Sequence, residues 1–96
     1  MKNQIAKKLI REEMWVNDGI CYLYRLTLRE GKSTADFRIP LYSIGVEMTD
    51  TDGRTTASEA KDIFDNCEKA IAFFEKLSRN LATPIDLNYI VEDEII

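Results

Sequence analysis

Residues 9–28 read LIREEMWVNDGICYLYRLTL, and this stretch decides the fold. At its centre stands Asp18-Gly19, a dipeptide that favours the positive φ angles of a two-residue hairpin turn. After the turn, Tyr22, Tyr24 and Leu26 alternate with other residues, as expected for a strand with one buried face. The stretch therefore predicts two antiparallel strands joined at Asp18-Gly19.

A helix is the alternative for the segment before the turn, because Ala6, Ile10 and Met14 recur at helical spacing. A hairpin, however, brings opposite charges together and apolar side chains together. The pairs that this turn implies are Glu12 with Arg25, Trp15 with Tyr22, Met14 with Leu23, and Leu9 with Leu28. A helix offers no such match, so we predict a strand over residues 9–16.

Two further strands follow the Glu30-Gly31 turn. Apolar residues occupy odd positions up to Leu41 and even positions from Tyr42 to Met48. Because proline cannot donate a ladder hydrogen bond, this switch predicts a break or bulge near Pro40 and a strand from Tyr42 to Thr49. After Asp52-Gly53, residues 55–63 alternate weakly, as is typical of an edge strand.

Two helices complete the predicted fold. Asp65 and Glu68 resemble a capping box, and an apolar stripe at helical spacing continues to Arg79-Asn80. Its members are Cys67, Ala70, Ile71, Phe74 and Leu77. Pro84 prevents simple continuation, and residues 87–95 predict a second helix that Asp86 could cap. The fold class expected for residues 1–96 is therefore one α+β domain: a four-stranded antiparallel β-meander followed by two helices packed on the sheet.

Composition excludes several classes of protein. At 45% apolar residues the chain is too hydrophobic for intrinsic disorder, and no apolar run approaches the about 20 residues that span a bilayer. The net charge of −4 comes from residues 55–96, which carry 9 acidic and 4 basic side chains, so nucleic acid and membrane surfaces are disfavoured partners. Without a recognisable leader, we expect a cytoplasmic protein whose Cys21 and Cys67 are reduced and buried.

The residues that most enzymes need are missing from the sequence. With no histidine, the chain lacks histidine-based catalytic triads and histidine zinc sites, and the two cysteines are too far apart for a CxxC motif. Asp50-Thr51-Asp52-Gly53 with Glu59 imitates part of a calcium loop, but its flanks predict strands and therefore a hairpin turn. We expect no enzyme activity, no cofactor and no bound metal.

Both faces of the predicted sheet carry apolar side chains, which one helix cannot cover. Trp15, Tyr22, Tyr24 and Leu26 share one face, and the opposite face then needs a helix, the N-terminal segment or another chain to cover it. This argument predicts self-association as a homodimer or contact with a protein partner. The candidate interface residues are Ile10, Met14, Val16, Leu23 and Arg25.

An RNA-binding sheet is the alternative interpretation of the tyrosines and arginines. Tyr22 and Tyr24, however, share a face with Leu26, whereas Arg25 and Arg29 lie on the other, so core aromatics with a solvated basic face fit better.

Three stretches support a family resemblance. They are Tyr22-Leu23-Tyr24-Arg25-Leu26, the segment from Tyr42 to Glu47, and the ending Thr83-Pro84-Ile85-Asp86-Leu87 with Ile90-Val91-Glu92-Asp93. In these the chain resembles a functionally uncharacterised family of small proteins from clostridia and related Firmicutes. Asp86 replaces a frequent histidine of that family, and Ser43 separates Tyr42 from the Ile-Gly pair. The resemblance implies a β-meander followed by helices, and it implies no activity.

Non-catalytic action through protein contacts, as an adaptor or regulator, is the function that these observations favour. A small-molecule or peptide binder using the cleft between sheet and helix is the first alternative. An enzyme that relies on carboxylates alone, for instance Glu47 or Glu59, is the second.

Overall fold

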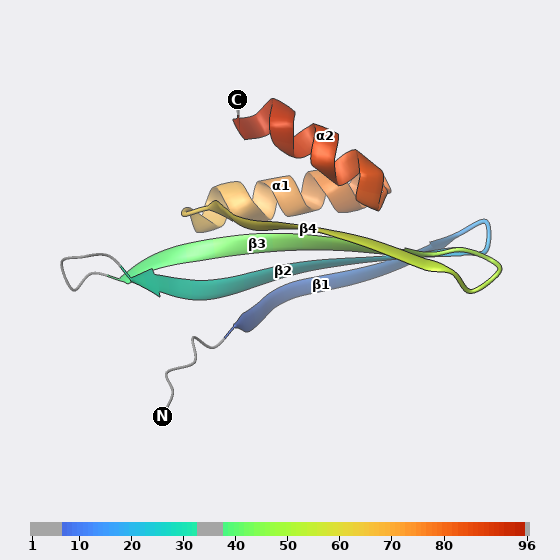
Figure 1. Cartoon of the computed structure of the whole chain (residues 1–96), viewed down its shortest axis with the longest axis horizontal. Coiled ribbons are helices and arrows are strands. Elements are labelled where there is room, and N and C mark those ends of the chain that lie inside the picture. The colour runs from blue at the N-terminus through green and yellow to red at the C-terminus, as the bar shows by residue number, and fades with distance from the viewer. Residues whose placement is uncertain (1–6, 33–37, 96) are drawn as a thin grey trace.

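The computed structural model of the chain describes residues 7–32 and 38–95. Four antiparallel strands lie side by side in sequence order: β1 (Lys8–Asn17), β2 (Ile20–Lys32), β3 (Arg38–Thr49) and β4 (Thr55–Phe64). Two helices follow, α1 (Cys67–Arg79) and α2 (Pro84–Ile95), as Figure 1 shows. The predicted α+β class, with a four-stranded meander and two C-terminal helices, is confirmed.

The β1–β2 hairpin turns where the sequence predicted. Asp18 and Gly19 both have positive φ angles, 54° and 79°, which is the backbone of a two-residue turn. Glu12 faces Arg25 and Trp15 faces Tyr22, as expected, but Leu9 faces Thr27 and not Leu28. The register shifts between Leu9 and Arg11, because one extra β1 residue is inserted there.

The break expected at Pro40 is wrong. β3 runs without a register shift from Arg38 to Thr49, and Pro40 pairs with Glu30 of β2. The pairing of β3 with β4 ends at Tyr42 and Phe64, so on its other side Pro40 has no neighbouring strand. A proline is tolerated at such an edge because no ladder hydrogen bond needs its missing N–H group.

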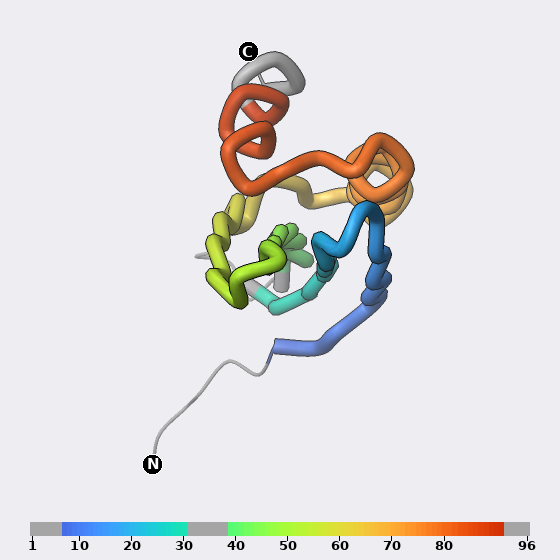
Figure 2. Tube along the Cα trace, turned by 90° about the vertical axis from the view of Figure 1, so that its right-hand side faces the viewer, coloured from blue at the N-terminus to red at the C-terminus, as the bar shows by residue number. Residues whose placement is uncertain are grey.

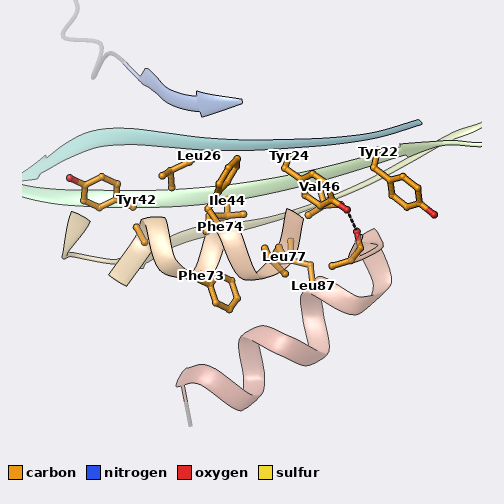
Figure 3. Close-up of a cluster of buried hydrophobic side chains, with 12 residues drawn as sticks. Tyr22, Tyr24, Leu26, Tyr42, Ile44, Val46, Phe73, Phe74, Leu77 and Leu87 are labelled. Carbon is orange, nitrogen blue, oxygen red and sulfur yellow. Dashed lines mark hydrogen bonds between the residues drawn. The ribbon is translucent and has the colours of Figure 1, made fainter. Parts of the chain in front are cut away.

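Both helices cover the same face of the sheet, as Figures 1 and 2 show from perpendicular directions. The core between them consists of helix-facing strand residues and the inner residues of the helices, drawn in Figure 3. Its largest fully buried side chains are Tyr24, Phe74, Leu26, Ile44, Leu77, Leu87 and Val46. The predicted separation of core tyrosines from outward arginines is confirmed, and the second sheet face receives neither helix.

The helix caps differ from the prediction by a few residues. Asn66, and not Asp65, caps α1, and its side-chain oxygen accepts a 2.9 Å hydrogen bond from the N–H of Lys69. Thr83 caps α2: its hydroxyl accepts from the N–H of Asp86, and the Asp86 carboxylate accepts from the N–H of Thr83. This is a reciprocal capping box in which Asp86 is the inner member, and Pro84 takes the first helical position, where it needs no partner.

Candidate protein-binding face

The open face is the side of the sheet that neither helix covers. Because residues directly opposite in an antiparallel pair share a face, the strand registers assign its members. They are Glu12, Met14, Val16, Cys21, Leu23, Arg25, Thr27, Ser43, Gly45, Glu47, Thr49, Thr55, Ala57 and Glu59. Four of the predicted interface residues, Met14, Val16, Leu23 and Arg25, therefore lie together on this face.

Ile10 does not join the other predicted interface residues. It is the extra residue at the β1 register shift, and it is partly buried against the hydrophobic core. The bulge turns Ile10 away from the face that simple alternation from Met14 would give it. Met14 and Val16 remain 64% and 69% exposed.

A hollow of about 410 Å³ opens on the open face, with Gly45 in its wall. Gly45 sits in the central strand β3, between Arg25 of β2 and Glu59 of β4. Its φ angle is not positive, and a Cβ atom would lie 3.9 Å from the nearest neighbour, the carbonyl oxygen of Ser58. Neither backbone geometry nor crowding requires glycine here, although a strand glycine costs about 0.5–1 kcal/mol relative to alanine. In the sequence, Gly45 is one of several residues that alternate with the apolar positions of this strand, and nothing there marks it as a site residue.

Charged side chains around the hollow are already paired with one another. Arg25 Nε lies 2.8 Å from Glu12 Oε2, and Arg25 Nη1 lies 4.0 Å from Glu47 Oε2. Lys7 Nζ lies 3.8 Å from Glu59 Oε2. The hydrogen bond to Glu12 is the main cause that raises the pKa of Arg25. The hollow thus combines apolar walls, Leu23 and Ala57, with charges that largely neutralise each other.

The carboxylates considered for catalysis, Glu47 and Glu59, both line this hollow. Each faces a cation, Arg25 and Lys7 respectively, so the structure brings two ion pairs together. Exposed ion pairs of this kind contribute little to stability, typically about 0–1 kcal/mol. These two ion pairs therefore determine the charge distribution on the open face and contribute little to the stability of the fold.

In the part of the chain that the structure describes, both cysteines are free thiols and neither belongs to a group of possible metal ligands. Cys21 is partly buried on the open face, whereas Cys67 is exposed at the start of α1, so the expectation of two buried thiols is wrong for Cys67. A hydrogen bond with Cys67 is the main cause that raises the pKa of Tyr42. Position 67 fits the helical stripe, but the stripe is exposed at the first turn of α1 and is buried or partly buried from Ala70 onward.

The segment that imitates a calcium loop forms the β3–β4 turn. The Asp50 carboxylate accepts 2.9 Å hydrogen bonds from the N–H groups of Asp52 and Arg54, which closes the turn. Within residues 7–32 and 38–95, no three Cys, Asp or Glu side chains gather as a metal site would require. The predicted hairpin turn is confirmed.

The cleft between sheet and helix, considered for a ligand, holds a second hollow of about 520 Å³ beside the end of β4 and the start of α1. Its apolar wall includes Phe64 and Phe73, whose rings meet edge to face with centroids 5.3 Å apart. Lys69 and Lys76 line its rim. Phe73, which belongs to the hydrophobic core, forms part of the wall of this hollow.

β4 has a bulge at Asp62, near the end of the strand, where its pairing with β3 shifts register between Ile44 and Tyr42. Asp62 has φ 55°, and its carboxylate binds the Arg29 guanidinium through two contacts, 3.0 and 2.6 Å. Its N–H donates to the Ser43 hydroxyl at 2.8 Å. Hydrogen bonding to Arg29 is the main cause that lowers the pKa of Asp62. The sequence carried no clear signal of this bulge, because aspartate is only one of several residues that tolerate positive φ.

Substitutions at Asp62 should separate backbone strain from the ion pair. Both Asp62→Gly and Asp62→Ala remove the carboxylate, but alanine at positive φ adds a strain of about 1–2 kcal/mol, so we expect Asp62→Ala to be less stable by about that amount. Urea unfolding at neutral pH measures this difference. Equal stabilities of the two variants would contradict the positive φ angle.

The Asp62 ion pair should also give a pH dependence. Because its folded-state pKa is lowered, its stabilisation is present above the unfolded-state value of about 4 and is lost as pH falls through the folded-state pKa. The stability difference between the native chain and Asp62→Asn should therefore shrink on acidification below about pH 4. A difference that stays constant down to low pH would show that the carboxylate charge is not involved.

The fold defines a small α+β protein in which both helices leave one face of a four-stranded sheet uncovered. The chain belongs to the family described as "Family of unknown function (DUF6514)", whose model matches residues 3–96. No curated protein and no solved structure matches the chain. In the part of the chain that the structure describes, no helix is long and apolar enough to cross a membrane.

Proposed function

We propose that this protein acts without catalysis, as an adaptor or regulator, by binding another protein through the open face. The observation that carries the proposal is the hollow at Gly45, where a strand glycine leaves space that no part of the fold needs. Interior strand glycines often mark a bulge, a tight bend, or a site where a ligand or another backbone approaches closely, and the strand registers show no bulge at Gly45. The proposal places the protein in the cytoplasm, where reduced cysteines are expected.

The chemistry of the hollow favours an apolar side chain of a partner protein. A charged ligand would have to break the pairs of Arg25 with Glu12 and of Lys7 with Glu59 before it could bind. An apolar side chain contacts Leu23, Ala57 and the bare backbone of Gly45 without disturbing them. Exposed apolar residues next to the hollow, Met14 and Val16, extend the contact surface.

The test uses Gly45→Val, which adds a side chain in the hollow, where a Cβ atom would lie 3.9 Å from its nearest neighbour, the carbonyl oxygen of Ser58. We expect the variant to be at least as stable as the native chain, since valine is a better strand residue than glycine. Proteins that co-purify with the tagged native chain should be lost from Gly45→Val and kept by Tyr89→Val, a control on exposed surface of α2 that lines neither hollow. A stable Gly45→Val that keeps every partner would overturn the proposal.

A further inference from the structure

Strand β1 concentrates the exposed apolar surface of the molecule. Seven large apolar side chains are exposed among those that the structure describes, and four of them belong to this one strand at the sheet edge. The four are Leu9, Met14, Trp15 and Val16. Edge strands normally carry charges or bulges that discourage pairing with another chain, so this concentration of apolar side chains is unusual.

These side chains point to both faces of the sheet. Met14 and Val16 lie on the open face, whereas Trp15 stands opposite Tyr22 on the helix-covered face and is still 48% exposed. A protein that docks on the open face would cover Met14 and Val16 but would leave Trp15 in water. A strand placed beside β1 covers all three, because its own side chains also alternate between the two faces.

Only the second half of β1 is free for such pairing. Its first half carries the register shift at Ile10 and the Arg11 guanidinium, which pairs with Glu13 at 3.3 Å and with Glu75 of α1 at 3.2 Å. Bulges and engaged charges protect an edge. Residues 13–17 contain no bulge, and Glu13, which pairs with Arg11, is the one charged side chain among them.

The hairpin turn determines which backbone groups of β1 point outward. In a two-residue hairpin the pair next to the turn, here Asn17 and Ile20, is hydrogen-bonded, and the pairs then alternate. Trp15 therefore bonds to β2, whereas the N–H and C=O groups of Met14 and Val16 point away from the sheet. These groups can form a new antiparallel ladder.

We infer that β1 pairs with β1 of a second copy of this chain, antiparallel and with Trp15 opposite Trp15. In this register Met14 lies beside Val16 of the second copy, on the open face, and the two residues exchange ladder hydrogen bonds. Glu13 lies beside Asn17 of the second copy. Every exposed apolar side chain of residues 14–16 then meets an apolar side chain on its own face.

Neighbouring symmetric registers are less favourable. Centring the two-fold axis on Met14 would place Glu13 opposite Trp15, and centring it on Val16 would place Asp18 opposite Met14, so each gives up apolar contacts. Centring it on Glu12 or on Glu13 would place like charges directly opposite each other, which destabilises a strand pair. The apolar segment is thus self-complementary about Trp15, as a two-fold interface requires. A contact of five residues per strand is small, so we expect a weak dimer.

This dimer goes beyond the proposed function, because it uses the edge strand β1 and leaves the hollow at Gly45 uncovered. Two copies would form one continuous eight-stranded sheet, with four strands from each copy. The two open faces, each with its hollow at Gly45, would then form one surface. Gly45→Val separates the two outcomes, because it adds a side chain in the hollow but leaves strand β1 unchanged and should therefore still dimerise.

Sedimentation equilibrium of the full chain, from about 10 µM to about 1 mM, tests the inference. The mass should rise from 11.1 kDa toward twice that value. Trp15 is the only tryptophan, so its fluorescence should shift to shorter wavelength over the same range as the ring leaves water. Val16→Lys should weaken the dimer at least tenfold, because it places a charge at the centre of the new strand pair.

Tyr89→Lys provides the matched control, since Tyr89 of α2 is 66% exposed, like Val16, but lies away from β1. It should dimerise as the native chain does. Circular dichroism must show that both variants are folded; if Val16→Lys is not, Val16→Thr replaces the apolar contact with little change of shape and should also weaken the dimer. A mass that stays at 11.1 kDa up to about 1 mM, or a dimer that a folded Val16 variant leaves intact, would overturn the inference.

Discussion

Phe74→Ala is expected to lower the free energy of unfolding by about 3–5 kcal/mol. Phe74 is fully buried in the core between α1 and the sheet (Figure 3). The Arg11 guanidinium lies 5.5 Å from the centre of its ring. The substitution removes an aromatic side chain and leaves a cavity that the long strands β2 and β3 cannot close. A small domain has about 5–15 kcal/mol of stability, so a large part of it would be lost.

Urea unfolding followed by circular dichroism measures this effect. Tyr89→Ala is the control, because it also removes an aromatic ring from a helix, but from a side chain that is 66% exposed. Its effect should stay within about 0.5 kcal/mol. A loss below about 1 kcal/mol for Phe74→Ala would show that α1 does not pack on the sheet as described.

Tyr24→Phe should cost about 1–3 kcal/mol, although it removes a single oxygen atom. The Tyr24 hydroxyl donates a buried 2.9 Å hydrogen bond to the carbonyl of Ala82, which lies in the link between α1 and α2 (Figure 3). Phenylalanine would leave that carbonyl without its partner inside the protein. Tyr22→Phe is the control, because it makes the same chemical change one position along the same face of β2.

The same residue should respond to alkaline pH. Burial is the main cause that raises the pKa of Tyr24 above its ordinary value of 10.0. Because the folded-state pKa is the higher one, the stabilisation is complete below about pH 10 and is lost as pH rises through the folded-state pKa. The native chain should therefore lose more stability above pH 10 than Tyr24→Phe does. Equal losses would show that the Tyr24 hydroxyl is not buried.

Local chemistry made the hairpin and its strands predictable. Asp18-Gly19 fixes both the turn and the pairing next to it, and the alternation of Tyr22, Tyr24 and Leu26 fixes which face is buried. Opposite charges at Glu12 and Arg25 then confirm the register. These signals lie close together in the sequence and do not depend on distant contacts.

The bulges could not be predicted, because they depend on contacts between distant residues. The β4 bulge exists where Asp62 meets Arg29 and Ser43, which lie 33 and 19 positions away in the chain. At Pro40, the change of apolar parity suggested a break, but the strand continues because β4 has already ended beside it. The alternation of apolar residues indicates which face of a strand is buried. It does not indicate where the neighbouring strand ends.

The candidate site was predictable only in part, for the same reason. Met14, Val16, Leu23 and Arg25 follow the alternation of their strands, whereas Ile10 was misplaced because the β1 bulge shifts the alternation by one residue. Gly45 was missed because its meaning depends on the empty space around it. The sequence also did not show that both helices pack on one face, which the contact of Tyr24 with Ala82 helps to fix.

Binding of a partner through the open face is tested most directly by photo-crosslinking inside the cells that produce the protein. A photoreactive amino acid at Leu23, in the wall of the hollow, should give a discrete adduct with another protein. The same amino acid at Tyr89, on exposed surface of α2 outside both hollows, should give none. If Leu23 yields no adduct, or if both positions yield the same one, the open face is not the binding surface.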